Sequence, residues 1–274
     1  MSIQSIVHKI QSLPPLPESV QKIQKLYASG DPDIAKLVKI IESDPMLTSD
    51  VLANANSPLY GFSKKIISVN QAITLFGTSN IRSVVLATST QKNFVLNFSP
   101  YGINNAQYSQ MCNLQSVLMF QWYMSVDIQK AKVLIPLIFL SEMGKILIAQ
   151  DMLSSVYLSE FKKAIKETDD ISKVEYHYAM TTTYALNAML YKHWNFDDMF
   201  IEIVEYLDNP SDEKAYLKEF ANAIKVINTA VNVNALLTDK SIEKATKLAE
   251  SFGYDATRFE KTAKRVQQKR DEGV

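Results

Sequence analysis

The histidines come first, because an imidazole can act as a base, a nucleophile or a metal ligand. The chain of 274 residues has three: His8, His177 and His193. A straight helix over 171–193 would hold His177 and His193 about 24 Å apart along its axis and roughly 160° apart around it. They cannot then share a metal ion. His8 lies near the amino terminus and is expected on the surface. The histidines therefore indicate no metal centre.

Cys112 is the one thiol in the sequence. A thiol becomes a nucleophile when a neighbouring base or positive charge stabilises its thiolate, and no histidine stands near Cys112 in the chain. A lone thiol also makes neither an internal disulfide nor a cysteine zinc cage. We therefore expect a core cysteine. Such cysteine usage fits a reducing, cytoplasmic compartment best.

Sequence motifs for phosphate binding and hydrolysis are absent. The chain has no G-x-x-x-x-G-K loop, no dinucleotide glycine fingerprint, no H-E-x-x-H helix and no G-x-S-x-G elbow. Its 29 basic and 29 acidic residues cancel, which disfavours nucleic acid as a partner. Basic residues recur near the carboxy terminus, but acidic residues stand among them, so we interpret that face as solvated. These basic residues are Arg258, Lys261, Lys264, Arg265, Lys269 and Arg270.

The elements that must position any site are helices. Apolar residues at helical spacing indicate helices within 17–30, 31–41, 43–55, 68–76, 79–94, 104–125, 130–152, 155–167, 171–193 and 197–206. A long helix is expected after Pro210 as far as about Leu237, and two more near 240–252 and 256–270. Glycine is scarce, at 7 residues, and no stretch alternates as a strand does. The sequence predicts an all-α fold without a significant sheet.

The most apolar run, 133–140, is too short to span a bilayer. Extending it brings in Glu142 and Lys145, which are costly in lipid. The first ten residues lack the apolar stretch of a secretory signal. We expect a buried core helix and no membrane insertion. The aromatic residues Trp122, Tyr123, Trp194 and Phe196 are likewise expected in the core.

An ordered series of short motifs occupies the first third of the chain. Leu-Pro-Pro-Leu-Pro at 13–17 comes first, and similar pieces follow at 44–48, 52–57, 60–61, 67–69, 72–73, 75–77 and 81–82. In this order they resemble the HDOD domain family, a relative of the HD metal-dependent phosphohydrolases. Glu175, His177 and the pair at 194–195 extend the resemblance over roughly 10–210. It implies an HD-like bundle in two subdomains, 1–98 and 99–210, with a helical extension over 211–274.

In the hydrolase relatives a His-Asp pair precedes a short apolar-Gly-Lys stretch on a buried helix. The matching stretch here is 140–145, with Ser141 at the histidine position and Glu142 at the aspartate position. Serine is a poor metal ligand, and one carboxylate holds a hard cation loosely. Histidines that relatives would supply near 107–114 and after residue 200 are also absent. Hydrolysis needs a metal-activated water. The resemblance therefore implies that this chain has no catalytic residue, no metal and no cofactor.

The resemblance leaves a vestigial polar pocket at this place. Its implied lining is Ser141, Glu142, Lys145, Glu175 and His177. The simplest interpretation is a satisfied Glu142–Lys145 pair inside the old cavity, and a true ligand pocket is the alternative.

The family implies a non-catalytic bacterial signalling or regulatory module that acts through protein partners, in control of motility or gene expression. Two other functions stay open. One is a residual metal-dependent phosphohydrolase acting on nucleotides or cyclic dinucleotides. The other is a sensor that binds a small anionic ligand through Lys145.

Overall fold

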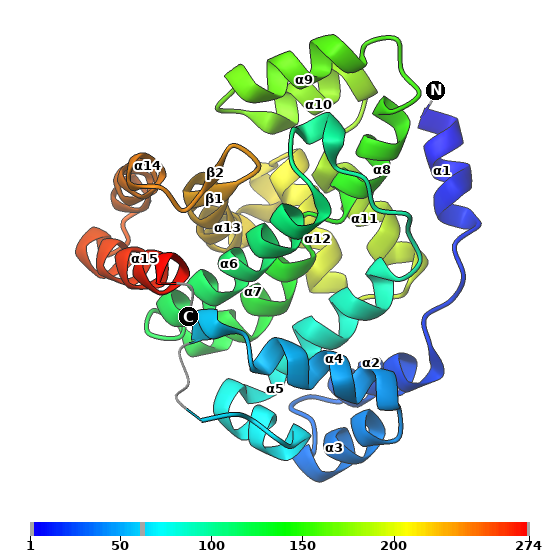
Figure 1. Cartoon of the computed structure of the whole chain (residues 1–274), viewed down its shortest axis with the longest axis vertical. Helices are drawn as coiled ribbons and strands as arrows, with labels where there is room; N and C mark the ends of the chain where they lie inside the picture. Colours follow the sequence, from blue (N-terminus) through cyan, green and yellow to red (C-terminus); the bar gives the residue numbers. More distant parts are fainter. Residues whose placement is uncertain (1–2, 61–63, 273–274) are drawn as a thin grey trace.

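The computed structural model describes residues 3–60 and 64–272 (Figure 1). Gly61, the second residue of the predicted motif at 60–61, lies outside these ranges. The amino-terminal elements are α1 (Ile3–Gln11), α2 (Glu18–Ala28), α3 (Ile34–Glu42), α4 (Pro45–Ala55), η1 (Pro58–Tyr60) and α5 (Val69–Gln91). The central ones are η2 (Ser99–Tyr101), α6 (Asn105–Tyr123), α7 (Ile128–Leu140), α8 (Gly144–Met152), α9 (Leu158–Glu167), α10 (Ile171–Ala179), α11 (Thr183–His193) and α12 (Asp198–Asp208).

The last part of the chain contains η3 (Asp212–Leu217), α13 (Lys218–Ala230), β1 (Val231–Asn232), β2 (Ala235–Leu236), α14 (Asp239–Ser251) and α15 (Ala256–Asp271). The two strands form a small antiparallel hairpin, in which Val231 pairs with Leu236. The hairpin is the one sheet within the described ranges. The expected all-α fold without a significant sheet is confirmed.

The helix starts in the first third follow from local side-chain caps. Asp33, Asp44 and Ser68 each accept backbone N–H bonds in the first turn of α3, α4 and α5, which satisfies amides that a helix start leaves unpaired. Gly77 interrupts α5 with φ 78° and ψ 162°, as the predicted end of a short helix requires.

Three predicted helices are wrong in extent. The helix over 130–152 breaks between α7 and α8, and the helix over 171–193 breaks at Met180, which adopts a left-handed φ of 55°. His177 and His193 therefore lie on different helices. The helix expected to reach Leu237 ends at Ala230, because the chain turns there into the β1–β2 hairpin.

Helix α7 lies in the middle of the fold, against α5 and α6 (Figure 1). The stretch Ile128–Met152 is long and apolar enough to cross a membrane, but 89% of its apolar 18-residue window is buried inside the protein. Most of its apolar side chains are buried, as expected for a core helix. The predicted core aromatics are buried too, and Trp122 packs edge-on against Tyr254 and Phe259 of the carboxy-terminal part.

The basic face of α15 makes contacts within the protein. Arg258 donates to the carbonyl of Ser125 at 2.8 Å, and Arg270 donates to that of Leu237 at 3.1 Å. Lys264 pairs with Glu260 at 2.6 Å. Several of these cations therefore already have partners inside the protein.

Candidate functional site

The turn at 141–143, which separates α7 from α8, is held by Asn187 of α11. The side-chain amide of Asn187 donates to the carbonyl of Ser141 at 2.5 Å, and its oxygen accepts the amide N–H of Gly144 at 2.7 Å. Asn187 is fully buried. Its two bonds replace helical bonds that the break removes, since a buried backbone group needs a partner.

Gly144 allows α8 to start directly against α11. A Cβ atom built on Gly144 would lie 2.3 Å from the carbonyl oxygen of Thr183 and 2.9 Å from its Cα. No side chain fits there. This close backbone approach brings the next residue, Lys145, beside Thr183, whose hydroxyl lies 3.2 Å from the Lys145 ammonium.

The carboxylate of Glu175, on α10, is fully buried and fully bonded. Its Oε1 accepts from the Tyr101 hydroxyl at 2.9 Å and from the Thr183 hydroxyl at 2.7 Å. Its Oε2 accepts the Thr183 backbone N–H at 2.7 Å. Lys145 Nζ lies 3.4 Å from Oε1. These donors offset the cost of burying the charge.

Lys145 joins Glu175 to Glu142. Its Nζ lies 2.8 Å from Oε2 of Glu142, whose other oxygen accepts from the side chain of Gln115 at 3.0 Å. Lys145 is only 7% exposed and Glu142 only 4%. Burial acts to lower the pKa of Lys145, but the carboxylates of Glu142 and Glu175 outweigh burial and raise this pKa above its ordinary value. The ammonium therefore stays charged at neutral pH.

The same buried surroundings raise the pKa values of two neighbouring groups, the Tyr101 hydroxyl and the Cys112 thiol. Burial, then the charge of Glu175, raises the pKa of the Tyr101 hydroxyl. Burial, then the charge of Glu142, raises the pKa of the Cys112 thiol. Cys112 is buried, as predicted, and its thiol is protonated at neutral pH. It is therefore a poor nucleophile.

Of the five residues implied by resemblance, the structure brings three together: Glu142, Lys145 and Glu175. Ser141 is buried beside them, but its hydroxyl donates back to the carbonyl of Ile138 at 2.8 Å. His177 does not join the group. It lies on the exposed face of α10 and stacks edge-on against Tyr178.

The sequence does not predict four side chains that belong to the site. They are Tyr101, Gln115, Thr183 and Asn187. Two of them carry a recognisable signal. Gln115 and Asn187 are polar residues inside apolar helical runs and are fully buried, and a buried amide needs bonded partners. Tyr101 and Thr183 give no such signal, because their roles depend on how η2 and α11 pack.

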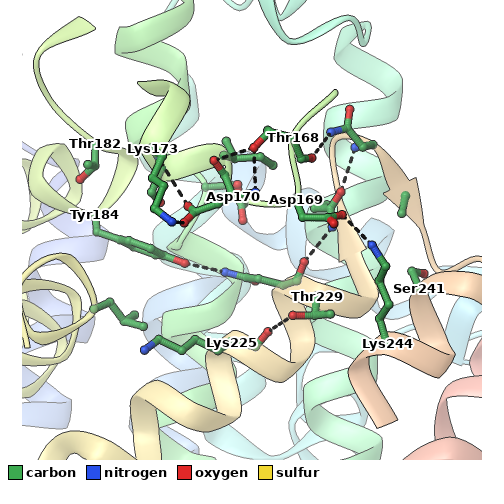
Figure 2. Close-up of a pocket in the computed structure, with 18 of the residues that line it drawn as sticks. Thr168, Asp169, Asp170, Lys173, Thr182, Tyr184, Lys225, Thr229, Ser241 and Lys244 are labelled. Carbon is green, nitrogen blue, oxygen red and sulfur yellow. Dashed lines mark hydrogen bonds and ion pairs between the residues drawn. The ribbon is translucent and has the colours of Figure 1, made fainter. Parts of the chain in front are cut away.

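A wide cleft of about 1540 Å³ opens above this buried group, and Glu142 and Lys145 lie at its floor. The cleft is enclosed by the 166–173 segment, the starts of α11 and α14, the end of α12, and α13 (Figure 2). Asn228 of α13 donates to the Tyr184 hydroxyl at 2.9 Å across one wall. Burial raises the pKa of Tyr184 to about 12.

The residues present do not fit the divalent metal of the HD hydrolases. No cluster of three or more His, Cys, Asp or Glu side chains suited to a metal occurs in 3–60 or 64–272. The two buried carboxylates are already bridged by the Lys145 ammonium. A divalent cation would have to lie beside that charge or displace it.

A scan against family models matches the HDOD domain over residues 13–210, well over half of the chain. The chain belongs to the HDOD domain family. The match confirms the resemblance carried by the motifs from 13–17 onward. It places the buried Glu142–Lys145–Glu175 group inside the domain, and the α13–α15 part outside the matched range.

Solved structures share the fold over nearly the whole chain. A virulence factor of Campylobacter jejuni subsp. jejuni is 25% identical, with a TM-score of 0.56, over 97% of this chain and 96% of that one. A protein of Marinobacter aquaeolei VT8, provisionally named as a signal transduction protein, is 16% identical (TM-score 0.69; 98% and 62% covered). A protein of Shewanella amazonensis SB2B, provisionally named as a phosphohydrolase, is 14% identical, with a TM-score of 0.68, over 96% of this chain and 97% of that one.

Among curated proteins, an uncharacterized protein of Treponema pallidum (strain Nichols) is 26% identical over 81 residues. The aligned part is 30% of this chain and 16% of that protein. The match therefore covers a small part of either protein.

Proposed function

We propose that this HDOD protein is a non-catalytic regulatory module of bacterial signalling, which acts in the cytoplasm by binding a protein partner. Membership of the family supports a signalling role, and so does the fold shared with a protein provisionally named for signal transduction. The observation that carries the non-catalytic part is the position of Lys145. Its buried ammonium is paired with Glu142 and Glu175, where a hydrolase would hold its metal.

A partner surface is available on α2 and α3. These helices border a shallow groove of about 450 Å³, with Leu26 and Ile40 in it and four lysines around it. The lysines are Lys22, Lys25, Lys36 and Lys39. Among the described residues no acidic side chain lines the groove, although Lys22 pairs with Glu18 at 2.7 Å. An apolar strip between ammonium groups is complementary to an amphipathic segment with acidic flanks. The proposed partner therefore presents an acidic segment with apolar side chains.

The test is partner binding by charge-reversed variants. Lys25→Glu/Lys39→Glu changes the groove, and Lys162→Glu/Lys163→Glu makes the same charge change on α9, at the far end of the molecule (Figure 1). A partner captured from the source bacterium is purified, and its affinity is measured at two salt concentrations. We expect the groove variant to bind at least about tenfold more weakly, and the wild type to weaken with salt.

Equal binding by the groove and α9 variants would show that the partner does not bind at the groove. Turnover of a nucleotide or cyclic dinucleotide by the purified wild-type protein would contradict the non-catalytic role. That turnover would have to disappear in Glu142→Gln to be assigned to this site.

A further inference from the structure

Six lysines and five carboxylates line the large cleft, so its charges nearly cancel overall, but they are unevenly paired. Lys173 pairs with Asp170 at 3.1 Å, and Lys244 pairs with Asp169 at 2.6 Å. Lys240 also lies near Asp169 and, after Lys244, helps to lower the pKa of that carboxyl. Two ammonium groups therefore share one aspartate on this side of the cleft.

On the α13 wall, Lys225 has no ion pair among the residues that the structure describes. Its backbone carbonyl accepts from the Thr229 hydroxyl at 2.8 Å (Figure 2). Lys166 also lines the cleft and likewise has no ion pair among the described residues. The opposing carboxylates are Glu167, also in the lining, and Asp208, which accepts a hydrogen bond from Thr182. An anion entering the cleft would find ammonium groups that need not give up an existing partner.

Three helices begin at the cleft and add to its positive field. The first turns of α10, α11 and α14 contribute Ser172, Tyr184 and Lys240 to its lining. The amino end of a helix carries a partial positive charge and favours anions. This contribution is secondary to the lysines, because Asp170 caps α10 with its own carboxylate.

The size of the cleft favours an occupant larger than a phosphate ion. At about 1540 Å³ it exceeds the roughly 300–1,000 Å³ of ordinary ligand pockets, so a bare phosphate would leave most of it as water. Its walls also offer Tyr176, Tyr184, Leu207 and Leu248. These side chains suit the organic part of a larger ligand, an aromatic ring above all.

We propose that this cleft binds a phosphorylated small molecule of nucleotide size. Lys225 of α13 and Lys240 of α14 supply the charge for its phosphates, and the tyrosine side chains contact its organic part. Lys145 stays paired at the floor and is not needed for binding. The site goes beyond the partner role and is separate from the α2–α3 groove, so either can exist without the other.

The test is calorimetric titration of the purified full chain, at fixed ionic strength, with adenosine and guanosine 5′-triphosphates and with inorganic pyrophosphate. Lys225→Ala/Lys240→Ala removes the two ammonium groups. Lys218→Ala/Lys247→Ala removes the same charge from the same two helices, at positions that do not line the cleft. Thermal melts confirm that both variants fold. All of these lysines are exposed.

We expect one triphosphate to bind per chain. The cleft variant should bind it with at least about tenfold lower affinity, which corresponds to about 1.4 kcal/mol. The affinity of the control should stay within about twofold of wild type. Pyrophosphate should compete, with lower affinity. Three outcomes would overturn the proposal. They are no triphosphate binding at millimolar concentration, equal loss in both variants, and pyrophosphate binding as tight as that of the triphosphates. The titration contains no partner protein, so a failure to bind triphosphate would not contradict the proposed partner role.

Discussion

Replacing Lys145 with methionine tests how much of the fold's stability depends on the buried ion cluster. Methionine keeps most of the aliphatic volume of lysine, so packing changes little. The carboxylates of Glu142 and Glu175 lose the ammonium that lies 2.8 Å and 3.4 Å from them. Removing one partner of a buried ion pair costs about 3–5 kcal/mol, because the other charge stays buried.

Not all of that cost should fall on Glu175. Its carboxylate keeps three hydrogen bonds, two from Thr183 and one from Tyr101. Glu142 keeps one hydrogen bond, from Gln115. We therefore expect most of the penalty at Glu142, and partial recovery in Lys145→Met/Glu142→Gln, with a coupling energy of about 1–3 kcal/mol.

The assay is urea unfolding followed by circular dichroism at neutral pH. Lys163→Met on α9, where the lysine is exposed, is the control and should change the free energy of unfolding by less than about 0.5 kcal/mol. A Lys145→Met penalty no larger than that of the control, below about 0.5 kcal/mol, would contradict this expectation. It would mean that water already solvates Glu142 and Glu175.

Three further outcomes follow from the site. Gly144→Ala should lower the free energy of unfolding by at least about 1–3 kcal/mol in thermal melts, because its Cβ would overlap the Thr183 backbone; an unchanged melt would contradict that packing. Asn187→Ala should lower it by about 1–3 kcal/mol, since it leaves the Ser141 carbonyl and the Gly144 N–H unpaired; a loss no larger than at a surface position would mean that water replaces both bonds. Burial, aided by Glu175 at Tyr101 and Cys112 at Tyr108, raises the pKa of both phenols. Their contribution is therefore fully present below about pH 10 and is lost as the pH rises. Above about pH 10 the free energy of unfolding should fall by about 1.4 kcal/mol per pH unit for each phenol that stays protonated. Unfolding and phenolate absorbance are followed together. Phenolate formation without unfolding would contradict the burial of these two side chains.

The fold was predictable wherever local chemistry decides it. The caps at Asp33, Asp44 and Ser68 and the break at Gly77 are read from a few neighbouring residues. The breaks at 141–143 and at Met180 were missed for a physical reason. The first is held by Asn187, more than forty residues away in the chain, and the second needs a left-handed residue that is not glycine.

The candidate site was predictable in part. The resemblance points to Glu142, Lys145 and Glu175, and the structure joins them in one buried cluster. His177 is different, because it follows Glu175 by two positions. That spacing turns it about 200° around the helix, to the exposed side. The cleft lysines Lys225 and Lys240 come from the part beyond the family match, where no motif indicated a function.

The proposed non-catalytic role requires that the Lys145 ammonium occupy the place of the metal in the hydrolases. Elemental analysis of protein purified without chelator or added metal tests this most directly. We predict far less than one equivalent of iron, manganese or zinc per chain, in the wild type and in Glu142→Gln alike. A full equivalent in the wild type, lost on changing Glu142 or Glu175, would contradict the non-catalytic role and favour a metal-dependent hydrolase.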